Sequence, residues 1–211
     1  MHSAIKYSLI MVVIAVCSTT QLHADEYNFD VYLNDKKVGT HQFEVSSAAD
    51  ARMVQSTANF NVKILFFSAY SYQHTNTEQW DDNCLRTFDA KTNLNGRPVE
   101  VSGATGKSGF VVEKSDSTEL LPDCVMSFAY WNPVFLQQER LLNPQTGDFL
   151  NVDVELMGVE MFEVRGEMVQ AQRYKVTAKD IDLMVWYSDE NKWLGLESVA
   201  KPGKVIRYEL S

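Results

Sequence analysis

Two histidines, His41 and His74, are the residues of this chain best suited to proton transfer. His41 lies in VGTHQFEV and His74 in YSYQHTNTEQW. A neutral imidazole can act as a general base because its pKa lies near physiological pH. Neither histidine is accompanied by a G-x-S-x-G nucleophile turn. The pattern favours half-exposed strand residues, and we predict no catalytic residue.

Acidic pairs are the next candidates for chemistry. They occur at Asp81-Asp82, at Asp180 and Asp182, and at Asp189-Glu190. Paired carboxylates can hydrolyse glycosidic bonds only at a defined separation in space. The spaced oxygen ligands of a calcium loop are missing, and the few cysteines and histidines have no zinc-site spacing. We therefore interpret these pairs as solvated turns and expect no metal and no cofactor.

The string GATGKSG at 103–109 resembles a phosphate-binding loop. Gly106, Lys107 and Ser108 have the required order, but Val101 stands where the first glycine is needed. The residues that follow, FVVEKSD, are typical of a strand, whereas the loop needs a helix N-terminus to bind phosphate. We predict a hairpin turn and no nucleotide.

The first 24 residues have the pattern of a secretory signal peptide. Lys6 precedes an apolar run from Tyr7 to Val16, and QLHA supplies small residues for cleavage after Ala24. Lipoprotein processing at Cys17 is a weaker alternative because bulky Val16 precedes that cysteine. We expect a periplasmic protein with one mature domain over residues 25–211.

The net charge of the chain is −9. The first 24 residues contain one lysine and no acidic residue, so the expected mature protein has a net charge of about −10. An acidic surface argues against nucleic-acid partners, which are bound through clustered Lys and Arg. Anionic lipid headgroups are disfavoured for the same reason.

Two cysteines, Cys84 and Cys124, remain after the leader. In an oxidising compartment an even pair favours a disulfide. Two separate buried thiols are the alternative.

Alternation of apolar and polar residues dominates the chain and indicates strands. Residues 26–45 predict a hairpin, 58–80 predict two strands or one bent strand, and Asn95-Gly96 predicts a tight turn. Four more strands are expected between residue 171 and the C-terminus. The fold class predicted is mainly β: a strongly curved antiparallel sheet or partly open β-barrel.

One segment departs from this pattern. Residues 121–147 contain apolar residues at mixed spacing and the helix formers LQQERLL. Pro133 disfavours helical geometry in the residue before it. We predict a helical insert of one or two short helices, broken near Pro133.

Aromatic residues gather in 58–80, in the insert and in the last strands. Rings in an ordinary core are the simpler explanation for any single residue. As a set, they predict an apolar cavity between the curved sheet and the insert. The expected ligand-binding residues are Phe60, Phe66, Phe67, Tyr70, Tyr72, Tyr130, Trp131, Phe135 and Trp186.

Three blocks of the chain resemble exported bacterial domains of unknown function: YNFDVYLNDKKVGTHQFEV, SFAYWNPVF…LLNPQTG and the final 40 residues. The positions that carry the resemblance are Gly39, His41, Tyr130, Trp131, Asn132, Trp186, Tyr187 and Asp189. The expected layout is also distantly similar to periplasmic lipoprotein carriers of the LolA and LolB kind. This resemblance concerns the fold and implies no site.

Three functions remain open at this point. The first is a non-catalytic periplasmic protein that binds or carries a lipid-like ligand beneath the insert. The second is an envelope interaction or assembly factor without a small ligand, bound to another envelope protein. The third is an enzyme without a recognisable motif that uses His41 or His74.

Overall fold

The structure is a computed structural model that describes residues 23–48, 51–64, 67–201 and 203–211. The expected signal peptide therefore lies almost wholly outside the described residues. The first strand begins at His23, two residues before the expected mature N-terminus. No helix in these described ranges is long and apolar enough to cross a membrane.

The described residues form one antiparallel sheet. Its strands are β1 (His23–Leu33), β2 (Lys36–Ala48), β3 (Ala51–Ile64), β4 (Phe67–Asp81), β5 (Cys84–Leu94), β6 (Arg97–Thr105), β7 (Phe110–Glu113), β8 (Thr118–Leu121), β9 (Arg140–Asn143), β10 (Asp148–Val164), β11 (Glu167–Ala178), β12 (Ile181–Ser188), β13 (Trp193–Lys201) and β14 (Lys204–Leu210). Their order is β8-β7-β6-β5-β4-β3-β2-β1-β14-β13-β12-β11-β10-β9. The first and last strands meet in the middle of this order, where β1 pairs with β14.

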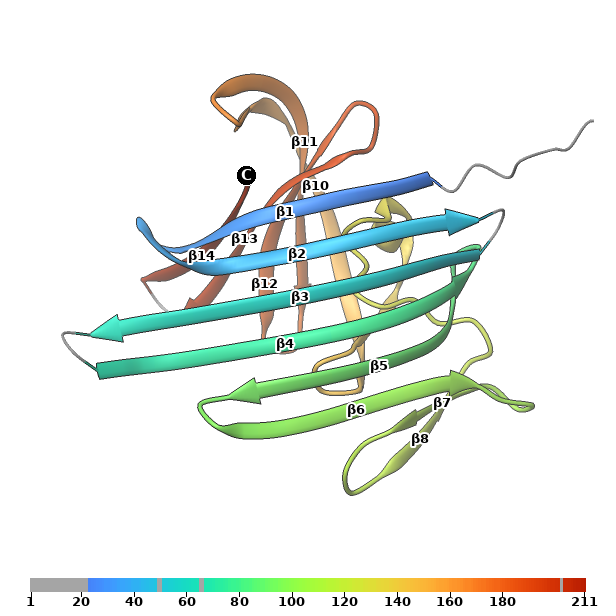
Figure 1. The fold of residues 1–211 in the computed structure, drawn as a ribbon. Helices are drawn as coiled ribbons and strands as arrows, with labels where there is room; N and C mark the ends of the chain where they lie inside the picture. The colour runs from blue at the N-terminus through green and yellow to red at the C-terminus, as the bar shows by residue number, and fades with distance from the viewer. Residues whose placement is uncertain (1–22, 49–50, 65–66, 202) are drawn as a thin grey trace, which may run out of the picture.

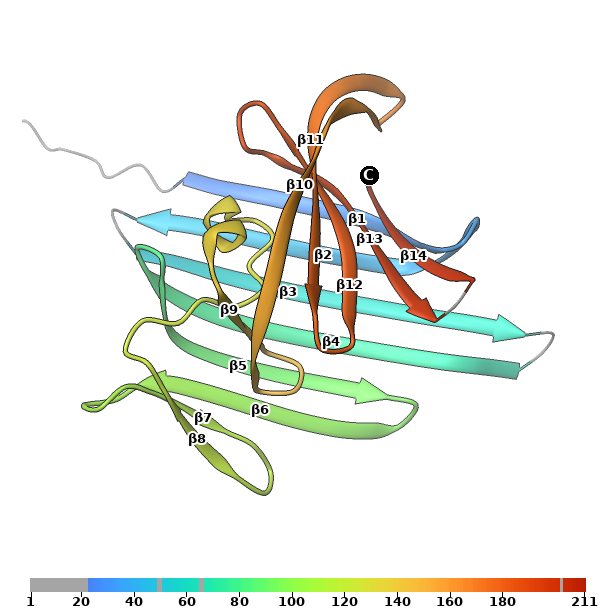
Figure 2. The ribbon, with the colours of Figure 1, turned by 180° about the vertical axis from the view of Figure 1, so that it is seen from behind.

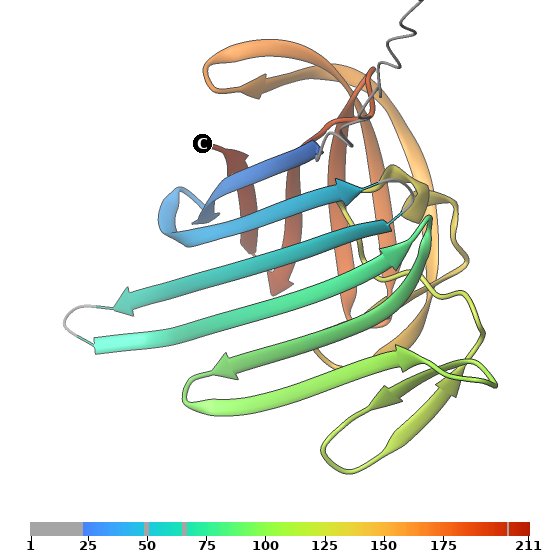
Figure 3. The ribbon, with the colours of Figure 1, turned by 45° about the vertical axis from the view of Figure 1, so that its right-hand side comes forward.

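The sheet curves strongly without closing. The long strands β1 to β6 form one wall, and β10 to β14 form a second wall that crosses behind it (Figure 1). Viewed from the side, the two walls face each other (Figure 3). Strands β8 and β9 stand at the two ends of the strand order. The predicted fold class, a curved and partly open antiparallel sheet, is confirmed.

Alternation along each strand explains which side chains face inward. On β4, buried positions at 72, 74, 76, 78 and 80 alternate with exposed positions between them. The Asn95-Gly96 turn is confirmed, since both residues have positive φ, 53° and 81°. The first three residues of GATGKSG end β6, and the other four form the turn to β7, closed by Gly106 N–H donating to Gly109 O at 2.8 Å.

The segment 121–147 differs from its prediction. Its only helix in the described structure is a five-residue 3-10 helix, Pro133–Gln137, capped by the Asn132 side chain. Pro133 begins this helix instead of breaking one, because proline lacks the N–H that a first helical residue leaves unpaired. The predicted helix over LQQERLL is wrong, since Arg140–Asn143 is strand β9. Pairing with β10 buries Leu141 and Leu142 completely, and this burial outweighs their helix propensity.

The disulfide prediction agrees with the structure, which joins Cys84 and Cys124. Next to the bridge, Leu85 N–H donates to Val125 O at 2.9 Å. A further bond runs from Asn132 Nδ2 to Asn83 Oδ1 at 3.0 Å. The start of the 121–147 segment is therefore fastened to the first residues of β5, and the segment passes between the two walls (Figure 2).

Candidate functional site

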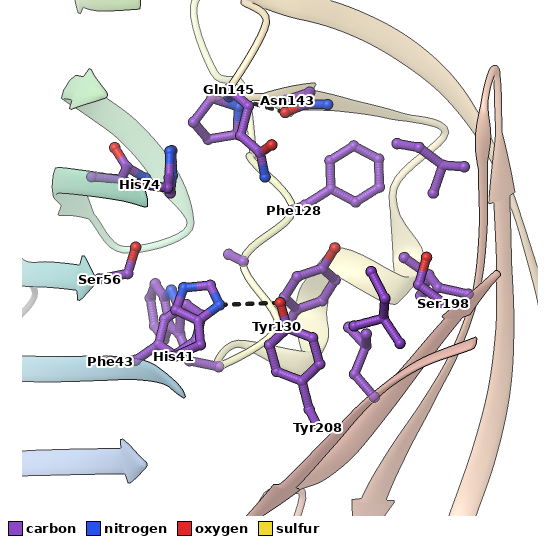
Figure 4. Close-up of a pocket in the computed structure, with 18 of the residues that line it drawn as sticks. His41, Phe43, Ser56, His74, Phe128, Tyr130, Asn143, Gln145, Ser198 and Tyr208 are labelled. Atoms are coloured by element: carbon purple, nitrogen blue, oxygen red, sulfur yellow. Dashed lines mark hydrogen bonds between the residues drawn. The ribbon is translucent and has the colours of Figure 1, made fainter. Parts of the chain in front are cut away.

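A pocket of about 330 Å³ lies on the concave side of the sheet. Its lining comes from three parts of the chain: strands β2 to β4, the 121–147 segment, and strands β12 to β14. Figure 4 shows these parts around one space, with His41, Ser56 and His74 on one side, Phe128 and Tyr130 in the middle of the view, Tyr208 next to His41, and Ser198 on the opposite side. Residues of the insert therefore form one side of the pocket.

Small residues on β3 create the hollow. In the antiparallel register, Ala58 lies between His41 of β2 and His74 of β4. Ser56 lies in the same way between Phe43 and Asn76. Inward side chains in such rows are neighbours. A short side chain in the central strand therefore leaves a depression between longer ones.

Aromatic rings form the apolar part of the wall. Phe60 stacks on Tyr72, with ring centroids 5.1 Å apart and an interplanar angle of 15°. Tyr208 meets Phe60 edge-on at 6.3 Å. Trp131 packs edge-on against Trp80 at 5.4 Å. These contacts hold the rings at the pocket in fixed orientations, which makes the wall preorganised.

His41 combines stacking with an open hydrogen-bonding position. Its ring stacks on Phe43 at 4.1 Å, and its Nδ1 lies 3.3 Å from the Tyr208 hydroxyl. Its Nε2 is buried and has no hydrogen-bond partner among the described residues. Burial, with a smaller contribution from His74, lowers the pKa of His41 to about 3. His41 is therefore neutral near pH 7.

His74 is the second neutral imidazole at the pocket. Its side chain is buried, and its Nδ1 lies 2.8 Å from the Thr92 hydroxyl. Burial lowers its pKa to about 4. In the described part of the chain, the hydrogen-bond partners of the two histidine side chains are the hydroxyls of Tyr208 and Thr92.

Glu78 places a buried carboxyl group at the pocket. Its Oε1 accepts hydrogen bonds from Asn76 Nδ2 at 2.9 Å and from Ser127 Oγ at 3.0 Å. Its Oε2 accepts one from Trp80 Nε1 at 3.0 Å. Burial raises the pKa of Glu78, and these three donors oppose the rise. The Asn76 amide is fixed by this network, and its Oδ1 is buried without a partner among described residues.

The described lining residues include neither lysine nor arginine. Glu78 and Asp180 are the acidic residues among them. With both histidines neutral, none of the described lining residues carries a positive charge. The described residues also contain no group of three or more His, Cys, Asp or Glu side chains able to hold a metal ion.

The structure brings together four of the nine residues expected at a ligand site: Phe60, Tyr72, Tyr130 and Trp131 all line the pocket. Phe66 lies outside the described residues. Phe67 is described only as the first backbone position of β4.

Three of the expected residues do not line the pocket. Phe135 is fully buried in the core, where its ring meets Tyr130 at 5.6 Å. Tyr70 is 36% exposed and stacks on Tyr72. Trp186 faces the other side of β12, where it stacks on Phe162 at 4.9 Å and donates to Glu160 Oε1 at 2.7 Å. It belongs to a second, smaller core cluster.

Several pocket residues were not expected from the sequence. Ser56, Asn76, Glu78 and Tyr208 are the main ones. The available signal was QHTNTEQW, in which both faces of a strand are polar. A strand with one core-facing side usually has apolar residues on that side. The inward-facing polar residues His74, Asn76 and Glu78 depart from this pattern, and this departure was the signal for a polar site.

Comparisons with known proteins support the fold. A solved structure similar to this chain is the β-barrel-like protein of DUF1849, a domain of unknown function, from Brucella abortus. The two have a TM-score of 0.65 and 12% identity, over 92% of this chain and 98% of the other. At this identity the likeness concerns the fold alone. No curated protein matches the chain. The model of the domain of unknown function DUF6134 matches residues 29–211, so the chain belongs to the DUF6134 family.

Proposed function

We propose that this protein is an exported, non-catalytic binding protein that holds a small ligand with an apolar body beneath its 121–147 segment. The observation that carries the proposal is the pocket itself, lined by fixed rings and roofed by a segment that is fastened at one end by a disulfide. Ligand sites are typically concave, mostly apolar and furnished with a few polar groups. The disulfide also supports an oxidising compartment such as the periplasm.

The size of the pocket limits the ligand. A volume of about 330 Å³ holds roughly ten groups the size of a water molecule, at about 30 Å³ each. A chain of about ten carbon atoms fits this space, and a longer chain would extend out of the open side of the pocket. Each buried methylene contributes about 0.8 kcal/mol to affinity.

The second candidate, an envelope assembly factor, required an exposed aromatic patch on the insert. Trp131 and Phe135 are instead buried, and a pocket lies behind the insert. These observations support ligand binding over assembly. The third candidate, an enzyme, receives no support from a histidine–acid pair.

The test is native mass spectrometry of the protein purified from periplasm without detergent, followed by organic extraction. We expect a reproducible added mass that extracts as an amphiphile. Ser56→Leu should abolish it, because the larger side chain fills the hollow. Thr57→Leu is the matched control, since Thr57 is exposed on the opposite face of β3. A wild-type protein that carries no added mass and takes up no ten-carbon amphiphile would contradict the proposal.

A further inference from the structure

Two polar atoms at the pocket are left without partners by the protein. Asn76 is 9% exposed and its Oδ1 is buried, and His41 Nε2 is buried as well. Both residues line the same pocket. A buried polar atom without a hydrogen bond destabilises the fold, so two such atoms in one cavity favour a bound group that supplies the bonds.

The network around Asn76 determines what it offers. Its Nδ2 donates to Glu78 Oε1, which orients the amide so that Oδ1 is the free atom. A carbonyl oxygen only accepts hydrogen bonds. The ligand must therefore bring a donor to this position.

His41 offers a complementary position. Its Nδ1 is next to the Tyr208 hydroxyl, which can donate or accept. Nε2 of a neutral imidazole then carries a proton or a lone pair according to the tautomer. A hydroxyl or a carboxamide can satisfy either form, because each group both donates and accepts.

The charge around the pocket excludes an anionic head. The lining contains Glu78 and Asp180 but neither Lys nor Arg. Both histidines are neutral near pH 7 because burial lowers their pKa values to about 3 and about 4. A buried carboxylate without a positive partner is strongly disfavoured.

A cationic head also lacks a suitable partner. Glu78 is the buried acid, but its oxygens already accept three hydrogen bonds from the protein. Burial raises its pKa, and the same three donors oppose the rise. The pocket therefore favours a ligand head that forms hydrogen bonds and disfavours one that carries a charge.

We infer that the polar end of the ligand is an uncharged hydrogen-bonding group, a hydroxyl or a carboxamide, held at Asn76 Oδ1 or at His41 Nε2. This inference rests on the proposed function and specifies its ligand as a neutral amphiphile. A chain of about ten carbon atoms fits the pocket volume at roughly 30 Å³ per group.

The experiment compares four ligands that share one ten-carbon chain: 1-decanol, decanamide, decanoate and decylammonium. Each is titrated calorimetrically into the full mature protein at pH 7.5. We expect 1-decanol or decanamide to bind at least tenfold more tightly than either charged ligand. Equal or tighter binding of decanoate or decylammonium would overturn the inference while leaving the pocket's function intact. Failure of all four to bind would overturn both.

Variants locate the head group. Asn76→Leu keeps the approximate size of the side chain, and it should weaken the preferred neutral ligand about tenfold, the effect of one lost hydrogen bond in a buried site. His41→Leu tests the second position independently should Asn76→Leu disturb the Glu78 network. Thr77→Ala, on the exposed face of β4, should bind like wild type. Unchanged affinity in both folded pocket variants would overturn the inference.

Discussion

Ser127 and Glu78, 49 residues apart in the sequence, are joined by a buried hydrogen bond of 3.0 Å from Ser127 Oγ to Glu78 Oε1. The bond links the 121–147 segment to the C-terminal part of β4. Because Asn76 and Trp80 donate to the same carboxyl group, it also connects the roof of the pocket to the wall that carries its polar atoms. The position of the roof and the orientation of Asn76 are thereby determined by one network.

Ser127→Ala tests this link. We expect the free energy of unfolding to fall by about 1–3 kcal/mol, since a buried carboxyl oxygen loses a donor. Ser117→Ala is the matched control, because Ser117 is exposed and its hydroxyl bonds only to exposed Asp116; its value should stay within about 0.5 kcal/mol of wild type. Urea unfolding measures both. Equal losses in the two variants would contradict a role for the network.

The Cys84–Cys124 bridge should stabilise the fold mainly through the unfolded chain. It spans 40 residues of sequence, and closure of a loop of that length contributes about 4 kcal/mol in the chain-entropy model. Replacing both cysteines with serine should lower the free energy of unfolding by this order. Reduction of the wild type should reproduce the loss, and the double variant should not respond to reductant. A stable wild type that is unaffected by reduction would refute this.

Acidification should destabilise the protein through its buried histidines. Burial lowers the pKa of His74 to about 4, so below its unfolded value of about 6.5 the unfolded chain binds more protons than the folded one. The contribution of His74 is therefore complete above pH 6.5 and is lost as the pH falls toward 4. Between pH 7.5 and 5.0 this amounts to about 2 kcal/mol.

The measurement is urea unfolding of wild type and His74→Gln at pH 7.5 and 5.0. Between pH 7.5 and pH 5.0, the free energy of unfolding should fall by about 2 kcal/mol less in the variant than in the wild type. Glu78 acts in the opposite direction, because its pKa is raised, but it is present in both proteins and cancels in the comparison. Identical pH slopes would show that His74 titrates normally in the folded state.

Gly39 should be intolerant of a side chain. It lies opposite Phe60 in the β2–β3 register, and a Cβ at this position would overlap the backbone oxygen of Asn59. Gly39→Ala should cost about 1–3 kcal/mol or more, the usual effect of overpacking. Gly106→Ala is the control, since the nearest atom to its Cβ would be 3.5 Å away. Comparable stability of the two variants would disprove close strand approach at Gly39.

The sequence predicted the sheet well because its signals are local. Alternation in 26–45 and after 171 depends on neighbouring residues, and the Asn95-Gly96 turn depends on two. The insert was predicted less well. The pattern LQQERLL favours a helix, but burial of Leu141 and Leu142 against β10 requires knowledge of a distant strand.

The pocket depended more on tertiary structure than the sheet did. His41 and Tyr208 are 167 positions apart and meet only because β1 pairs with β14. Trp186 and Tyr187 are adjacent in sequence, yet only Tyr187 packs in the main core, where it donates to Tyr130 O at 2.6 Å. Composition can count aromatic rings, but it does not say to which side of a two-sided strand each ring points.

The sequence by itself determined an acidic, β-rich chain with a leader-like N-terminus, a pair of cysteines suited to a disulfide and a meander of strands, because each of these follows from composition or nearest-neighbour pattern. Only the tertiary structure decided that small Ser56 and Ala58 lie between longer side chains from β2 and β4. It also decided that Asn76 and His41 keep unpartnered atoms in the resulting hollow. Both facts arise from strand register and curvature, which bring together residues that the chain keeps far apart.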